Sequence, residues 1–191
     1  MKLQELSSSI KTPVFFGNDV QKLFSVETKN HINTQLHRMV KRGNLISIKR
    51  DMYFFPHTKI DEFVLANKLY MPSYVSLESV LYLSGIITEI PSNVTSITTI
   101  TSKKLITTSG IYLYSKLNKK LFFGYSSILD TKSDCYYNIA NVEKALLDFI
   151  YVRRLRNLDG YNINFTFINK DILTDYLIYF PKWVKKVIQN A

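Results

Sequence analysis

The sequence predicts an α+β protein: an N-terminal winged helix-turn-helix followed by a mixed domain with an antiparallel sheet flanked by helices. Three observations lead to this prediction. Residues 18–55 follow the element order of a winged helix: a short helix, a turn, a longer helix and a basic two-stranded ribbon. Residues 94–125 are rich in Thr, Ile, Tyr and Phe, as strands are. Residues 140–152 carry apolar side chains at helical spacing.

The longer helix of the predicted winged helix has two different faces. Its apolar residues share one face of a 3.6-residue period and are Ile32, Leu36, Met39 and Val40. The opposite face holds Asn30, Thr34, His37, Arg38 and Lys41, with His31 and Asn33 at its edges. No acidic residue lies between Thr28 and Lys49, whereas a face built only for solvation usually mixes both signs. We therefore expect this face to contact base edges and phosphates of DNA.

The elements around this helix have recognisable start and stop signals. Asn18 or Asp19 would cap the shorter helix, and Gly43 would end the longer one. A β-prone run then leads to the tight turn at residues 49–51, where Lys49 and Arg50 could reach a phosphate. The predicted DNA-binding residues are Asn30, Asn33, Thr34, His37, Arg38, Lys41, Lys49 and Arg50. The alternative is a winged helix that serves only as a protein–protein module.

Composition and charge limit the classes of partner and compartment. Of the net charge of +10, residues 1–60 contribute +6, from ten Lys/Arg and four Asp/Glu. This placement predicts a polyanionic partner, although the codon bias of an AT-rich genome would also raise the lysine content. The single cysteine, Cys135, excludes an internal disulfide. No apolar run approaches the roughly 20 residues that span a membrane, so we expect a cytoplasmic protein without a membrane partner.

The order of signals along the chain predicts three parts. Residues 1–56 form the winged helix, 57–62 a linker, and 63–191 the α+β domain. Within this domain we expect helices over 62–70 and 77–86, three or four antiparallel strands over 94–125, and a loop over 126–138 that ends in a short strand. Asn141 would cap the helix over 140–152. Asp171 and Pro181 would begin two final short helices.

No residue set in the chain predicts catalysis, a metal site or a cofactor. Gly124-Tyr125-Ser126, followed by Asp130 and Asp134, faintly suggests a nucleotidyltransferase loop, but the paired acids that would hold a metal are missing. We interpret both aspartates as turn residues. Glu143 and Asp148 could suggest a nuclease-like acid pair, but Glu143 falls in the first turn of its helix, where an acid favours the helix dipole. We therefore predict that the protein is not an enzyme.

Two basic clusters near the C-terminus form a candidate second contact for DNA or RNA. They comprise Arg153, Arg154 and Arg156, and then Lys182, Lys185 and Lys186. The alternative is a solvated face, which is the usual role of such charges. Trp183 is interpreted as an anchor that packs the last helix on the core rather than as a base-stacking platform.

Three blocks of the chain resemble AbiEi-type antitoxins, the transcriptional regulators of type IV toxin–antitoxin (abortive-infection) systems. The blocks are PSYVSLESVLYLSGIITEIP (72–91), ITTSGIYLYSKL (106–117) and IANVEKALLDFIY (139–151), and the resemblance covers roughly residues 14–155. It implies an autorepressor that binds double-stranded operator DNA. It also implies that the second domain counters a partner nucleotidyltransferase toxin without a stable complex. The chain departs from the family at Asp51, because such wings more often turn through Arg-Gly.

Two other function classes stay open from the sequence. One is a nuclease or nucleotidyltransferase-related enzyme that carries a DNA-targeting winged helix, which divalent-metal-dependent turnover would reveal. The other is an RNA-binding or scaffold protein, which a preference for a specific DNA duplex would exclude. For the repressor we expect two copies on an inverted repeat, since one helix reads too few base pairs for selectivity.

Overall fold

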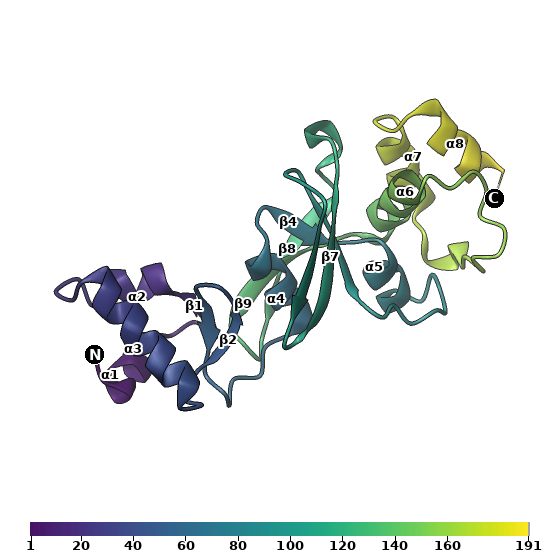
Figure 1. Ribbon diagram of the computed structural model, residues 1–191. Helices are drawn as coiled ribbons and strands as arrows, with labels where there is room; N and C mark the ends of the chain where they lie inside the picture. Colours follow the sequence, from purple (N-terminus) through teal and green to yellow (C-terminus); the bar gives the residue numbers. More distant parts are fainter. Residues whose placement is uncertain (191) are drawn as a thin grey trace. The chain divides into compact units, whose positions relative to one another are not determined.

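The computed structural model describes residues 1–190 and shows an α+β chain made of two compact units (Figure 1). Unit 1 comprises residues 1–65 with the short segments 107–109 and 129–135. Unit 2 comprises residues 66–106, 110–128 and 136–191. Within residues 1–190, no helix is both long enough and apolar enough to cross a membrane.

Unit 1 is built from three helices and a three-stranded sheet. In chain order its elements are α1 (Leu3–Ser9), β1 (Val14–Phe16), α2 (Gly17–Leu23), α3 (Lys29–Lys41), β2 (Ile46–Lys49) and β3 (Met52–Phe54). The strand order is β1-β3-β2, and both pairings are antiparallel. The sequence patterns identified the segments of α2, α3, β2 and β3, whereas α1 and β1 are additional elements that the patterns did not assign.

The hydrophobic core of unit 1 joins all three helices to the sheet. Its buried side chains come from α1, β1, α2, α3 and the start of the hairpin, and are Leu6, Phe15, Val20, Ile32, Leu36 and Leu45. Met39 and Val40 are only half-buried but pack against the same core. The predicted apolar face of the long helix is therefore confirmed as the face that holds α3 in place.

The ends of α2 and α3 are fixed by local hydrogen bonds. Phe16, not Asn18 or Asp19, is the N-cap of α2, so that prediction was wrong by two to three residues. Asp19 lies in the first turn instead, where its carboxylate accepts the backbone N–H of Phe16 at 2.9 Å. Thr28 caps α3 by accepting the backbone N–H of His31. Gly43 has φ +73°, as expected for a glycine that ends a helix.

Unit 2 contains a six-stranded sheet and most of the remaining helices. α4 (Glu62–Leu69) crosses the division between the units, and Asp61 caps it as predicted by accepting the N–H of Phe63 at 2.8 Å. The other elements are β4 (Ser73–Val75), α5 (Glu78–Leu83), β5 (Val94–Thr98), β6 (Lys103–Thr107), β7 (Gly110–Lys116), η1 (Lys119–Leu121), β8 (Tyr125–Asp130), β9 (Cys135–Ala140), α6 (Val142–Arg153), η2 (Phe165–Phe167), α7 (Lys170–Leu177) and α8 (Lys182–Gln189).

The sheet is mixed, so the predicted antiparallel sheet was wrong. Its strand order is β6-β7-β5-β4-β9-β8. β4 pairs with β5 antiparallel, but β5 pairs with β7 in parallel and β4 with β9 in parallel. We expected strands that are consecutive in sequence to pair with each other. Instead, β7 lies between β6 and β5, so β5 pairs with β7 and not with β6. Two pairings between strands distant in sequence therefore decide the topology.

Residues 126–138 form a hairpin and not the predicted loop. β8 and the predicted short strand β9 are joined by only four residues, 131–134. The Asp130 carboxylate accepts the N–H groups of Lys132 and Ser133 at 3.3 and 3.0 Å, and Asp134 has φ +50°. Asp134 is a turn residue, as predicted, whereas Asp130 is the last residue of β8 and its carboxylate accepts N–H groups of the turn. The segment before the turn forms a strand because β8, although mostly exposed, pairs with β9 and becomes the edge strand of the sheet.

Helix α6 is the central helix of unit 2. It contacts α5, α7 and α8 and begins at the predicted cap, where the Asn141 side chain accepts the N–H of Lys144 at 3.0 Å. Residues 143–150 are all buried, including three charged residues, so this helix is enclosed on most sides. The apolar spacing over residues 140–152 predicted the helix but did not indicate that its charged residues are buried as well. α7 and α8 begin within one residue of the expected positions 171 and 181.

Candidate nucleic-acid interface

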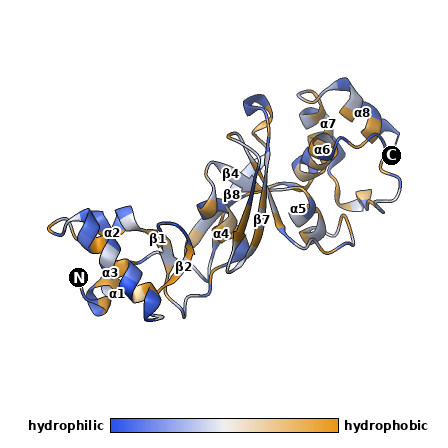
Figure 2. Ribbon diagram, viewed as in Figure 1, coloured by the Kyte–Doolittle hydropathy of each residue, from blue (hydrophilic) through white to orange (hydrophobic). Residues whose placement is uncertain are grey.

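The exposed face of α3 is the candidate nucleic-acid interface. Ile32 and Leu36 are 1% and 0% exposed and anchor the opposite face in the core of unit 1. The side chains left outside are those of Asn30, His31, Asn33, Thr34, His37, Arg38 and Lys41, and all seven residues are exposed. Figure 2 shows hydrophilic and hydrophobic residues along α3. The structure thus places the seven polar residues together on the solvent side of one rigid helix.

Two side chains of this face lie close to other groups of unit 1. The Thr34 hydroxyl donates a hydrogen bond to the backbone oxygen of Asn30 at 2.8 Å, which leaves its oxygen as an acceptor. The Asn33 amide oxygen lies at the start of α2, 3.6 Å from the position that a Cβ on Gly17 would take. Asn33 is therefore at the edge of the face beside α2.

The turn between β2 and β3 presents a second basic element. Arg50 is exposed, Lys49 is half-buried, and Asp51 adopts φ +63°, which few residues other than Gly, Asn or Asp tolerate. The backbone oxygen of Asp51 accepts the N–H of Gly17 at 3.4 Å. A Cβ on Gly17 would lie 2.2 Å from the Asp51 carboxylate, so the hairpin and the start of α2 approach closely because residue 17 is glycine.

The acidic residue nearest in sequence to α3 is occupied by other groups. Glu27 pairs with the amino group of Met1 and accepts a hydrogen bond from Gln35 at 3.0 Å. The hydrogen bond from the Met1 amino group is the main cause that lowers the pKa of Glu27. Within residues 1–190, Arg38 and Lys41 make no ion pair with an acid. The exposed face of α3 consequently keeps its positive charge.

The structure divides the second predicted basic patch among different neighbours. Arg153 donates to Glu78 at 2.6 Å, while the guanidinium of Arg156 lies 5.2 Å from the ring centre of Trp183. Trp183 also stacks on Tyr151 with 5.9 Å between ring centres, which agrees with its predicted role as an anchor of the last helix. The remaining members differ in exposure: Arg154, Lys182 and Lys186 are exposed, and Lys185 is half-buried.

A buried polar cluster in unit 2 was missed by sequence reasoning. The ammonium group of Lys144 pairs with the carboxylate of Asp148, and both side chains are fully buried. The Tyr74 and Ser76 hydroxyls each donate to the same carboxylate at 2.9 Å. Burial is the main cause that raises the pKa of Asp148 and of Tyr74 and lowers the pKa of Lys144. The i, i+4 spacing of a lysine and an aspartate inside an apolar helix was the available signal.

The other acidic residues considered for catalysis also have structural partners. Glu143 lies in the first turn of α6 as predicted, but it is buried and accepts the backbone N–H of Asn169 at 2.8 Å, so it holds the segment before α7. Its carboxylate and that of Asp148 therefore contact different groups. Within residues 1–190, no three His, Cys, Asp or Glu side chains are grouped as a metal site would require.

Comparison with known proteins does not assign this chain. A function must therefore be argued from the site residues, since a fold by itself supports many functions. The resemblance of residues 72–91, 106–117 and 139–151 to AbiEi-type antitoxins stays a prediction. The chain matches no model of a known protein family, and a comparison with curated proteins finds no match either.

Proposed function

We propose that residues 1–56 form a winged helix-turn-helix and that the protein binds double-stranded operator DNA through α3. The observation that carries this proposal is the acid-free exposed face of α3, held outward by Ile32 and Leu36. The element order of unit 1 and the exposed Arg50 in the β2–β3 turn support it, since a wing beside a recognition helix can reach a phosphate.

We further propose that the protein is the autorepressor and antitoxin of a type IV toxin–antitoxin system. Repression would follow from operator binding by two copies on an inverted repeat. Residues 63–191 would counter the partner nucleotidyltransferase without a stable complex. This part of the proposal rests on the resemblance of three sequence blocks to AbiEi-type antitoxins, and all of those blocks lie beyond residue 71.

Substitutions on α3 separate sequence reading from backbone binding. Asn30 lies in the N-terminal half of α3, the part that usually enters the major groove, whereas Lys41 lies in its last turn. Asn30→Ala should weaken binding to the operator by roughly 1–3 kcal/mol and leave binding to random duplex almost unchanged. Lys41→Ala should weaken both and lower the salt slope by about one unit for the lost phosphate contact.

The measurement is fluorescence anisotropy with a duplex selected from the DNA upstream of the gene, over a series of salt concentrations. Lys120→Ala is the matched control, because this exposed lysine lies in η1 of unit 2 and the substitution makes the same change in charge. It should leave both affinities unchanged. If the wild-type protein shows no salt-dependent duplex binding at low salt, the proposed function is wrong, and α3 is a protein-contact helix.

A further inference from the structure

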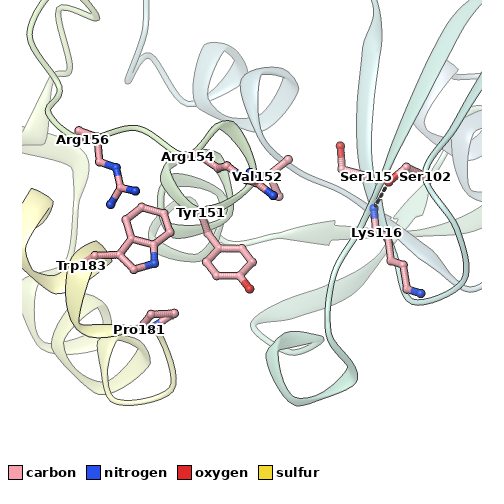
Figure 3. Close-up of a pocket in the computed structure, with 9 residues that line it drawn as sticks. All are labelled: Ser102, Ser115, Lys116, Tyr151, Val152, Arg154, Arg156, Pro181 and Trp183. Atoms are coloured by element: carbon pink, nitrogen blue, oxygen red, sulfur yellow. Dashed lines mark hydrogen bonds between the residues drawn. The ribbon is translucent and has the colours of Figure 1, made fainter.

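An open pocket of about 550 Å³ in unit 2 shares no residue with α3 or the β2–β3 turn (Figure 3). One wall is formed by the end of α6, the segment after it and the start of α8. The other wall comes from β7 and the residue before β6. The volume falls within the range of roughly 300–1,000 Å³ that small-molecule sites occupy. The chemistry of its walls indicates what could bind there.

The first wall offers an aromatic surface. Tyr151 and Trp183 are both half-buried and stack nearly parallel, at 17° between their ring planes. The Arg156 guanidinium lies over the Trp183 ring, 5.2 Å from its centre. A guanidinium on a ring face keeps N–H donors at its edge that can bind a phosphate. This wall therefore combines a stacking surface for a planar ring with a donor for an anion.

The charges around the pocket have one sign. Its cationic residues are Arg154, Arg156 and Lys116, and no acidic residue lines it. In the part of the chain that the structure describes, none of these three forms an ion pair, whereas the neighbouring Arg153 is paired with Glu78. Arg154 has φ +55° at the end of α6, so its backbone leaves the helix at the pocket wall. The pocket thus favours a ligand with negative charge.

The second wall supplies neutral polar groups. Ser102 and Ser115 line it together with Lys116, as Figure 3 shows. The Ser102 hydroxyl oxygen accepts the backbone N–H of Lys116 at 2.8 Å, which leaves its hydrogen available to donate. Hydroxyls at this position can bind ribose hydroxyls or the edge of a base.

We propose that this pocket binds a nucleoside phosphate, with the base against the Tyr151 and Trp183 rings and the phosphate at Arg154 and Arg156 on the same wall. Lys116 on the facing wall adds to the positive potential of the pocket. A free anion such as phosphate would use the cations but not the rings, and a neutral ring compound would use the rings but not the cations. A nucleotide uses both and also offers hydroxyls to Ser102 and Ser115. This inference goes beyond operator binding and does not depend on it.

Trp183 makes the test specific, because it is the only tryptophan in the chain. The full-length ¹⁵N-labelled protein is titrated with GMP and, separately, with AMP, while the single indole N–H resonance is followed by NMR. We expect a saturable shift of this resonance. Guanosine lacks the phosphate, and inorganic phosphate lacks the base. Each should therefore need at least about tenfold higher concentrations than GMP to reach half of the maximal shift, since each lacks one set of contacts.

The variant Lys116→Gln/Arg154→Asn removes two cations from the pocket. Asn is chosen at position 154 because it tolerates the left-handed backbone there. Affinity for GMP should fall about tenfold or more, since charge-assisted hydrogen bonds are lost. The control Lys120→Gln/Lys170→Gln removes two exposed lysines that neither line the pocket nor belong to the candidate second basic patch, and it should bind GMP as the wild type does.

Three results would overturn the proposal. The first is the absence of a saturable indole shift with either nucleotide in a protein whose spectrum is that of a folded chain. The second is an equal loss of affinity in the control variant, because binding would then reflect net charge alone. The third is saturation of the shift by an eight-residue oligothymidine at more than tenfold lower concentration than GMP, because the pocket would then belong to a surface for single-stranded nucleic acid.

Discussion

At the scale of single residues, the buried pair of Lys144 and Asp148 is expected to affect the stability of unit 2 strongly. Besides Asp148, the Lys144 ammonium donates to the Tyr74 hydroxyl at 2.9 Å and lies 5.3–5.4 Å from the ring centres of Tyr74, Phe123 and Phe180. Desolvation opposes both charges, and these partners offset it. The pair links α6 to β4, because Tyr74 belongs to that strand.

Replacing only one partner of this pair should therefore lower the free energy of unfolding more than replacing both partners by apolar residues. Asp148→Ala leaves a buried ammonium without its counter-charge, and we expect a loss of about 3–5 kcal/mol in the free energy of unfolding. The double variant Lys144→Met/Asp148→Leu should lose clearly less, because no charge is left uncompensated. Urea denaturation followed by Trp183 fluorescence measures both, with the exposed Asp159→Ala as control. Equal losses in the single and double variants would contradict this interpretation.

At the scale of elements, α1 and β1 complete unit 1. β1 pairs with β3 in register from Val14–Phe54 to Phe16–Met52, so β3 becomes the central strand of its sheet. Leu6 of α1 is fully buried in the same core as Ile32 and Leu36 of α3. The position of the proposed DNA-contacting helix thus depends on a helix outside residues 18–55.

Leu6→Ala should destabilise unit 1 by about 2–5 kcal/mol, since it removes a buried side chain and leaves a cavity. We expect faster backbone hydrogen exchange in peptides from residues 14–55 and weaker operator binding at 37 °C. Hydrogen-exchange mass spectrometry measures the first, with Gln4→Ala, an exposed position on the same helix, as control. Unchanged exchange in peptides from residues 14–55 would show that α1 does not support α3.

At the scale of the whole molecule, the basic balance favours a polyanionic partner, but a single α3 reads only a few base pairs. We expect two copies of the full-length protein on an inverted repeat, with half-site centres separated by whole helical turns of about 10 base pairs. Footprinting and sedimentation of the complex measure the repeat and the stoichiometry. Residues 63–191 alone should leave no footprint. A single asymmetric half-site bound at full affinity would contradict the expectation.

Much of the local structure could be predicted from the sequence because its signals are local. The apolar spacing of Ile32, Leu36, Met39 and Val40 predicts both the helix and the face that turns inward. The side chain of Asn141 caps α6 at the predicted residue, and Gly43 and Gly85 have the positive φ expected at helix ends. Side-chain capping, backbone freedom and helical periodicity each act within a few residues, so a single sequence reveals them.

The tertiary structure alone decided which distant segments meet. Nothing near residues 94–98 or 110–116 in sequence requires β5 and β7 to pair in parallel, and this pairing places β5 in the interior of the sheet. The burial of Lys144 and Asp148 depends on Tyr74 and Ser76, about 70 positions earlier. The pocket at Trp183 likewise needs Ser102 and Lys116 from the sheet. Such contacts depend on long-range packing, whose partners local patterns do not specify.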